Sequence, residues 1–241
     1  YAIRLGKPLI IIFGLGSANG SRTGASPLAE MMENLTKKPN ISVITCMGNE
    51  ANNKCHYKGT VMSALVPDVM EINVDGTGKG FTMEIWADSL GILSVSIESP
   101  SGEYVPIPAR MGANMEYTFL YEGSTVTVDY QITENVAGME VIFVRLKTPV
   151  EGTWKFYIYS LTNIKGSYNA WLPLKQFSGQ DIYFLKSDPD TTLTVPAAAD
   201  GVISVGAYNH YTGAAYYESG RGYSADGRIK PDFVAPGAGV Y

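Results

Sequence analysis

The side-chain amide of Asn49 stands where it could act on a developing negative charge. It follows a mostly apolar run, residues 41–47, that is typical of a buried strand and stops abruptly at Gly48. A carboxamide N–H can donate to an oxyanion, and a glycine beside it lets a substrate backbone come close. The alternative is an ordinary Gly-Asn turn after a strand, and this run alone does not separate the two.

Further segments accompany this motif along the chain. Residues 9–13 form a second apolar run, which ends on Gly14-Leu15-Gly16. Far downstream, a strand-like segment at 201–207 leads to Ser-Gly-Arg-Gly-Tyr at 219–223. The run Asp-Gly-Arg-Ile-Lys-Pro-Asp-Phe-Val-Ala-Pro-Gly then occupies 226–237.

Together, and in this order, these segments resemble the subtilisin-like serine proteases, called subtilases or peptidase family S8. The run at 226–237 is the most specific of them, whereas Gly14 stands where the family usually has Ser and Met47 where it usually has Ala. The resemblance covers residues 1–55 and 190–241. The middle of the chain looks like the insertion of a clostridial-type subgroup of the family.

The resemblance implies a role for several residues in peptide-bond hydrolysis. Asn49 would be the side-chain donor of the oxyanion hole. Gly14-Leu15-Gly16 would form the edge strand along which a substrate peptide pairs, and the absent side chain of Gly16 would leave room for the residue preceding the cut bond. Cys46-Met47-Gly48 would form the facing wall of that pocket. Met47 either points inward and narrows the pocket or simply fills the core.

The same resemblance implies that parts of a subtilase lie outside this sequence. The family uses Asp, His and Ser in that chain order, and these motifs would lie before Tyr1 and after Tyr241. We therefore expect an internal fragment of a serine endopeptidase, itself inactive, whose partners are the remainder of the protease domain and a protein or peptide substrate. No cofactor is implied. The alternative is a binding or interaction module, the β-rich middle, within a pseudoprotease.

Composition argues against other classes of function. The formal net charge of −5 gives no basic footprint for nucleic acid, and no apolar run is long enough to span a membrane. Asp188-Pro189-Asp190 lacks the ligand number and spacing of a calcium site, so no metal is expected. His56 and His210 match no catalytic motif and are expected to be structural or on the surface. Cys46 and Cys55 are expected as free thiols, although a local bridge stays open. The compartment is undecided, with an extracellular, cell-associated or spore-associated location favoured.

The elements that would position the candidate site begin with a strand, a helix and a strand in residues 1–55. Ser26 is a suitable N-cap and Pro27 a suitable first residue for a helix that runs to Lys37. Its apolar face would be formed by Leu28, Met31, Met32 and Leu35. Strands separated by a helix indicate a parallel pair, and their apolar runs are typical of strands covered on both faces.

Residues 56–187 have a different texture, because short alternating segments follow one another with turn signals between them. The segments are Phe81–Trp86, Leu93–Glu98, Thr125–Tyr130, Val141–Val144 and Trp154–Tyr159. This pattern predicts an antiparallel β-sandwich of jelly-roll type. The predicted fold is therefore an α/β parallel-sheet fragment of a subtilase domain, at 1–55 and 188–241, interrupted by an inserted β-sandwich at 56–187.

Overall fold

The computed structural model describes residues 2–76, 78–87, 92–107, 114–132, 139–162, 165–178 and 181–240. The chain forms two compact units. The first combines Tyr1–Asn53 with Pro189–Tyr241, and the second is Lys54–Asp188. The chain therefore leaves the first unit and returns to it after completing the second.

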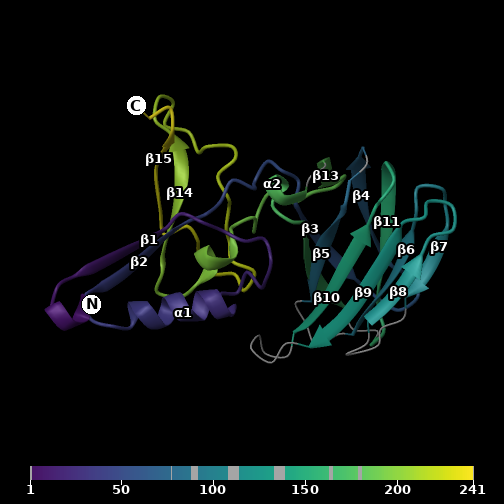
Figure 1. Ribbon diagram of the computed structural model, residues 1–241, viewed down its shortest axis with the longest axis horizontal. Helices are drawn as coiled ribbons and strands as arrows, with labels where there is room; N and C mark the ends of the chain where they lie inside the picture. The colour runs from purple at the N-terminus through teal and green to yellow at the C-terminus, as the bar shows by residue number, and fades with distance from the viewer. Residues whose placement is uncertain are drawn as a thin grey trace. The chain divides into compact units, whose positions relative to one another are not determined.

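The first unit contains a four-stranded parallel sheet with the strand order β1-β2-β14-β15 (Figure 1). Its elements are η1 (Ile3–Leu5), β1 (Leu9–Phe13), α1 (Pro27–Thr36), β2 (Ile41–Cys46), η3 (Val195–Ala198), β14 (Ile203–Asn209) and β15 (Phe233–Ala238). β1 and β2 pair in register from Leu9 opposite Ile41 to Phe13 opposite Thr45. The predicted parallel pair joined by a helix is confirmed.

Helix α1 begins where the sequence predicts, but its packed face differs from the prediction. The Ser26 Oγ accepts a hydrogen bond from the Ala29 N–H at 3.1 Å, and Pro27 is the first helical residue. Ala29 and Met32 are buried in the cluster that α1 forms with the sheet. Met31 is 56% exposed. Its predicted place on the packed face is wrong because the helix turns Ala29 toward the sheet instead.

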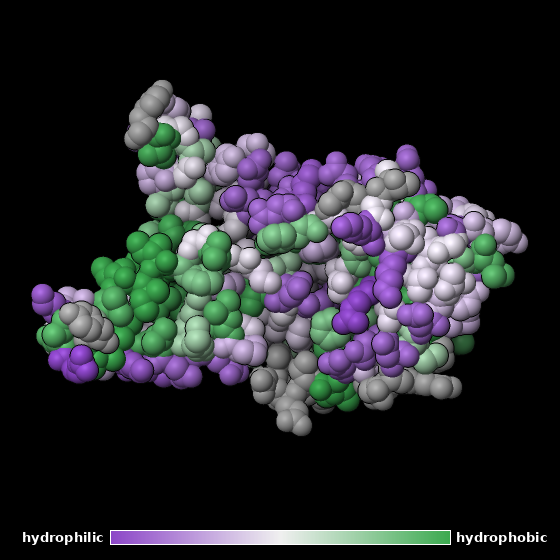
Figure 2. Space-filling model, in the orientation of Figure 1, coloured by the Kyte–Doolittle hydropathy of each residue, from purple (hydrophilic) through white to green (hydrophobic). Residues whose placement is uncertain are grey.

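Strand β1 buries only one of its two faces. Ile11 and Phe13 pack into the cluster beside α1, whereas Ile10 and Ile12 point to the opposite side and are 65% and 77% exposed. Figure 2 shows apolar side chains gathered on the surface of this unit. Within the described residues the second face of β1 is therefore uncovered, and the coverage of both faces of the parallel sheet stays a prediction.

The second unit consists of two antiparallel sheets, with the orders β3-β12-β5-β10-β9-β8 and β13-β4-β11-β6-β7. Its strands are β3 (His56–Val61), β4 (Asp68–Asp75), β5 (Gly80–Ala87), β6 (Leu93–Glu98), β7 (Tyr104–Ile107), β8 (Asn114–Thr118), β9 (Thr125–Ile132), β10 (Glu140–Lys147), β11 (Gly152–Ser160), β12 (Gly166–Trp171) and β13 (Asp181–Phe184). The short helix α2 (Lys175–Ser178) lies between the last two strands. The five predicted alternating segments correspond to β5, β6, β9, β10 and β11.

One cluster of buried side chains draws on both sheets of the second unit. Trp154 and Phe156 come from β11 in the five-stranded sheet, and Ile85 and Val128 come from β5 and β9 in the six-stranded sheet. All four are fully buried. The second unit therefore has a core of its own, made from the inward-facing residues of alternating strands.

The structure also describes the state of the cysteines, the length of the helices and the grouping of side chains that could bind a metal ion. Both cysteines are free thiols, and Cys46 is half buried while Cys55 is buried. No described helix is long and apolar enough to cross a membrane. Within the described ranges, no group of His, Cys, Asp and Glu side chains is arranged to hold a metal ion.

Candidate functional site

The candidate site lies where β1 and β2 end. Because the two strands are parallel and Phe13 pairs with Thr45, their carboxyl ends lie side by side at one edge of the sheet. The buried Thr45 hydroxyl reinforces this arrangement by donating to the Phe13 carbonyl oxygen at 3.2 Å. The two glycine-containing segments that follow these strands therefore leave the sheet as neighbours.

Asn49 is carried into solvent by a change of backbone direction at Gly48. Gly48 has a φ of +87°, a left-handed conformation that favours glycine. Asn49 is exposed, and its side-chain amide makes no hydrogen bond to any described residue. The loop beneath it is ordered, since Asn53 Nδ2 donates to the Asn49 carbonyl oxygen at 3.1 Å and to Glu50 Oε2 at 2.9 Å. The amide is thus free to donate from a held backbone.

The segment after β1 presents its backbone to solvent. Gly14 is exposed with open space where a side chain would be, and Leu15 is 70% exposed. Gly16 is different, because a Cβ there would lie within 2.7 Å of the Thr194 Oγ1. The first two residues therefore leave an accessible main chain, whereas the third packs closely on another part of the unit.

The segment after β2 divides its side chains between surface and core. Cys46 is half buried, whereas Met47 is 1% exposed and packs with Leu193, Ala197 and Ala198. Of the two interpretations of Met47, its burial in this cluster favours core filling. The Met47 N–H donates to the Val205 carbonyl oxygen at 3.1 Å, which continues the β2–β14 pairing past the end of β2.

Two segments that the sequence did not connect with Asn49 support its loop. The Thr194 N–H donates to the Met47 carbonyl oxygen at 3.0 Å, and its hydroxyl donates to the Cys46 carbonyl oxygen at 3.2 Å. The Gly220 N–H donates to the Gly48 carbonyl oxygen at 2.8 Å. A Cβ on Gly220 would collide with the Met47 carbonyl oxygen, so this approach requires glycine. The Ser-Gly-Arg-Gly-Tyr run signalled the second segment, but nothing in the sequence marked Thr194.

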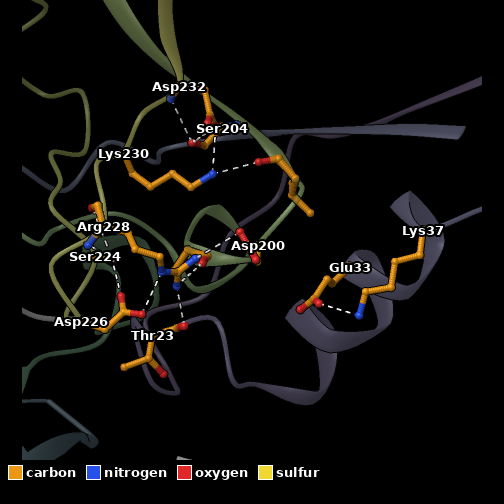
Figure 3. Close-up of polar contacts among 12 residues, drawn as sticks. Thr23, Glu33, Lys37, Asp200, Ser204, Ser224, Asp226, Arg228, Lys230 and Asp232 are labelled. Carbon is orange, nitrogen blue, oxygen red and sulfur yellow. Dashed lines mark hydrogen bonds and ion pairs between the residues drawn. The ribbon is translucent and has the colours of Figure 1, made fainter.

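The long run at 226–237 forms a polar network and does not point to chemistry of its own (Figure 3). Arg228 Nη2 donates to the carbonyl oxygens of Thr23 at 2.6 Å and Ala198 at 2.9 Å. Its Nε pairs with Asp226 Oδ2 at 2.8 Å. These bonds connect the loop before α1 with η3, so Arg228 holds together segments that flank the candidate site.

Asp232 and Lys230 make the second half of this network (Figure 3). Lys230 Nζ, on a side chain that is 6% exposed, donates to the Val202 carbonyl oxygen and to Asp232 Oδ2, both at 2.9 Å. Asp232 Oδ2 also accepts from the Ser204 N–H at 2.7 Å. Burial acts to raise the pKa of Asp232, but the bonds from Ser204 and Lys230 outweigh it and hold that pKa below its usual range.

The two histidines lie in different surroundings. His56 is fully buried in the second unit, where its Nε2 lies 2.9 Å from Asn169 Oδ1 and its ring stacks on Trp171. His210 is exposed after β14, and its backbone N–H donates to the Ala238 carbonyl oxygen at 2.9 Å. His56 is therefore structural and His210 lies on the surface.

Comparison with known proteins identifies the family. The family model of the subtilases matches residues 10–240, nearly the whole chain. This chain belongs to the subtilase family. The resemblance seen in the sequence is confirmed, and the match extends through the middle of the chain. A comparison with curated proteins gave no match.

This subtilase chain is also similar to a solved structure, that of the CspB protease of Clostridium perfringens. The two superpose with a TM-score of 0.85 at 26% sequence identity. The similarity covers 98% of the present chain and 49% of that protein. The subtilase chain thus spans about half the length of this relative.

As part of a subtilase, the arrangement can do one thing well. An exposed carboxamide that follows a strand end can donate hydrogen bonds to an anion that forms beside it. It cannot itself form or break a covalent bond, because a carboxamide is neither a nucleophile nor a useful proton acceptor at neutral pH.

Proposed function

We propose that this chain is the oxyanion-hole and substrate-cleft section of a serine endopeptidase. The observation that carries the proposal is the exposed, unbonded amide of Asn49, held at the shared edge of β1 and β2. Family membership supports it, because subtilases are serine peptidases. Protein or peptide chains are the proposed substrates, and no cofactor is needed for this chemistry.

In the proposed reaction, Asn49 acts on the carbonyl oxygen of the scissile bond. As a serine attacks the carbonyl carbon, negative charge develops on that oxygen and the Asn49 N–H donates to it. The serine, the histidine that takes its proton and the aspartate that orients the histidine would come from the remainder of the protease domain. The 241-residue chain alone is therefore proposed to be inactive.

The substrate would lie as an extended strand along Gly14-Leu15-Gly16. Its open backbone, with Leu15 70% exposed, is suited to pairing by main-chain hydrogen bonds. Cys46-Met47-Gly48 would form the facing wall through its backbone, because the Met47 side chain is turned into the core. Two such walls would fix the scissile carbonyl beside Asn49.

The remainder of the protease domain is also the proposed partner of the bare face of β1. Ile10 and Ile12 expose large apolar side chains on a strand whose other face is packed. Such a face is stabilised when another apolar layer covers it. The length of the CspB relative, of which this chain covers 49%, supports a partner supplied by the same polypeptide.

For the second unit we propose an inserted β-sandwich of jelly-roll type within the subtilase domain. Its two antiparallel sheets share one core, and the first unit resumes at Pro189. The domain boundaries that we propose are 1–55, 56–187 and 188–241. The division of the chain into two compact units, the second of which is Lys54–Asp188, supports them.

Substitution of Asn49 in the full-length protein tests the proposal. We expect Asn49→Ala to lower kcat by about a hundredfold or more, a magnitude known from this same family, with little change in KM. The reason is that the hydrogen bond strengthens only as the oxygen becomes an anion. The melting temperature should not change, because the amide is exposed and unbonded.

Asn52→Ala is the matched control, since Asn52 is an exposed asparagine in the turn that follows Asn49. It should leave both kcat and KM unchanged. Unchanged turnover in a folded Asn49→Ala protein would remove the assignment. Equal losses in both variants would mean that the turn as a whole, and not the Asn49 amide, matters.

A second candidate function is an interaction module, and one surface of the second unit favours it. Tyr104 is 47% exposed, and its hydroxyl lies 3.1 Å from that of Tyr159. The rings of Tyr104 and Tyr157 form a T-shaped pair with their centroids 5.5 Å apart. Grouped tyrosines are enriched in protein interfaces. The full-length sequence separates the two candidates, because a pseudoprotease would lack one of the Asp, His or Ser motifs.

A further inference from the structure

The five-stranded sheet of the second unit has one face that points away from the core, and tyrosines gather on that face. Along β11, Trp154 and Phe156 turn into the core, so Tyr157 and Tyr159 point to the opposite side. Tyr104 meets them from β7, because its hydroxyl lies 3.1 Å from that of Tyr159 and its ring forms a T-shaped pair with Tyr157. Three rings from two strands therefore lie together on this outer face.

Hydrogen bonds hold these rings in place. The Tyr157 hydroxyl donates to Glu98 Oε2 at 2.5 Å, and the hydroxyls of Tyr104 and Tyr159 bond each other. The bond to Glu98 raises the pKa of Tyr157 to about 12, so its hydroxyl stays protonated at neutral pH. Rings that are already fixed lose less conformational freedom when a partner binds to them.

Carboxylates lie beside the rings and give this face a negative charge. The strand register sets Glu71 opposite Lys155, Lys155 opposite Glu98, and Glu98 opposite Tyr104. Bonds from Tyr157 and Lys155 hold the pKa of Glu98 below its usual range, so it is ionised. Lys155 pairs with Glu98 at 2.9 Å, whereas no described residue donates a hydrogen bond to the Glu71 carboxyl group. One negative charge therefore stays available next to the rings.

Another tyrosine on the same face already holds a cation. Tyr183 lies on β13 at the edge of this sheet, and Ile182 and Phe184 on either side of it pack toward the core. Lys54 Nζ lies over the Tyr183 ring, 5.1 Å from its centroid. This distance is within the range of a cation–π interaction. The second unit thus shows, within its own chain, how a tyrosine of this face takes up a basic side chain.

We infer that this tyrosine face, defined by Glu71, Glu98, Tyr104, Tyr157 and Tyr159, binds a basic segment of a partner protein. An arginine guanidinium would stack on the rings and pair with Glu71, because guanidinium is planar and matches a carboxylate with two N–H groups. An apolar partner would bury the carboxylates of Glu71 and Glu98 without a counter-charge, which is costly. The inference rests on the second candidate function, the interaction module, and not on peptidase activity.

The partner chemistry is tested by calorimetric titration of the 241-residue chain with capped model peptides. A peptide of Arg-Gly-Ser repeats should bind about tenfold more tightly at low salt than a Gln-Gly-Ser peptide of equal length. A Lys-Gly-Ser peptide should lie between the two, because ammonium stacks less well on aromatic rings. Equal affinities for the arginine and glutamine peptides would overturn the inference.

Substitutions of Tyr104 locate the binding. Tyr104→Ala should weaken binding of the arginine peptide about fivefold or more, because it removes a ring that is 47% exposed. Tyr104→Phe should retain most of the affinity, since it keeps the ring and loses only the hydroxyl bond to Tyr159. Tyr217→Ala is the matched control, because Tyr217 is 57% exposed and belongs to the first unit. Equal losses in Tyr104→Ala and Tyr217→Ala would contradict binding at the tyrosine face.

Substitution of Glu71 tests the charge. Glu71→Gln should weaken binding of the arginine peptide at low salt and reduce the loss of affinity that added salt causes. Glu116→Gln, which alters a 61% exposed glutamate of the other sheet, should match the wild-type chain. The same salt dependence in all three proteins would show that Glu71 is not the counter-charge and would overturn the pairing.

A neutral glucose oligosaccharide separates the inference from the broader function. If the wild-type chain bound the oligosaccharide and not the arginine peptide, and Tyr104→Ala lost that binding, the inference would be wrong and the interaction module would stand. Tyr104→Ala in the full-length protein should leave kcat/KM for a short peptide substrate unchanged. The endopeptidase proposal is tested at Asn49, so the two can fail separately.

Discussion

In the second unit Trp154 and Phe156 are sealed between two sheets, whereas in the first unit Ile10 and Ile12 of β1 stand in solvent. Burial of apolar surface is the main favourable contribution to folding. The two units are therefore not equally stabilised by their own cores. The second has completed its core, and the first retains apolar surface that is not used for folding. The candidate site lies on the first unit. Its performance should therefore depend on whatever covers β1.

The largest effect on this comparison should come from the closed core. Trp154 is fully buried, its ring meets Phe119 edge-on at 5.1 Å, and its Nε1 donates to the Val150 carbonyl oxygen. Trp154→Ala should lower the free energy of unfolding of the second unit by about 3–5 kcal/mol, because it leaves a cavity. Urea denaturation and calorimetry measure this loss of unfolding free energy. Trp154→Phe should cost clearly less, and equal costs would contradict a close-packed core.

A buried carboxyl group gives the next largest effect. Burial raises the pKa of Glu140 to about 7, even though the Leu93 N–H donates to its Oε2 at 2.7 Å and acts to lower that pKa. Its Oε1 has no hydrogen-bond partner among the described residues. In the unfolded chain a glutamate carboxyl group ionises near pH 4.3, so folding favours the protonated form of Glu140. The contribution of Glu140 to stability is then fully present below about pH 4.3 and is lost as the pH rises through about 7.

The measurement is the free energy of unfolding at pH 5 and pH 8. The wild-type chain should lose on the order of 3 kcal/mol over this interval, as expected from the size of the shift. Glu140→Gln should show a much smaller loss, because it cannot ionise. Glu116→Gln, on a side chain that is 61% exposed, should follow the wild-type curve. Parallel curves for all three proteins would show that Glu140 does not set the pH dependence.

The smallest effect should come from the open face. Ile12 is 77% exposed, so Ile12→Ser should change the free energy of unfolding of the 241-residue chain by less than about 0.5 kcal/mol. The same substitution should cost about 1–3 kcal/mol in the full-length protein if the remainder of the domain buries Ile12. A large loss in the 241-residue chain would mean that β1 is already covered and that the contrast between the two units is false.

The parts of the fold that the sequence predicted are those with local signals. Ser26 and Pro27 mark the start of α1 through a cap and a fixed φ, both of which involve neighbouring residues only. The alternating segment Trp154–Tyr159 likewise falls within β11. β3 and β12 were not predicted, because each lacks clear alternation and their pairing joins Val61 to Gly166, more than a hundred residues later in the chain.

In the candidate site, too, the features with local signals could be predicted and those that depend on distant residues could not. The strand and the glycine before Asn49 could be recognised from adjacent residues, and the family resemblance added the expected role. Thr194 could not be recognised, because its bond to the Cys46 carbonyl oxygen spans 148 positions of sequence. The orientation of Met47 was likewise undecidable until Leu193 and Ala197 were seen to pack on it. Side-chain direction at a strand end depends on partners that periodicity does not reveal.

The loop that carries Asn49 is held mostly by its own main chain. The Thr194 N–H bonds the Met47 carbonyl oxygen, the Gly220 N–H bonds the Gly48 carbonyl oxygen, and the Ala51 N–H bonds the Glu218 carbonyl oxygen. Peptide groups are the same whatever side chains they bear, apart from proline. Substitutions of Met47 or Glu218 can therefore accumulate while the backbone conformation of the loop is retained. Evolution is thus free to vary the side chains around this loop without moving the Asn49 amide.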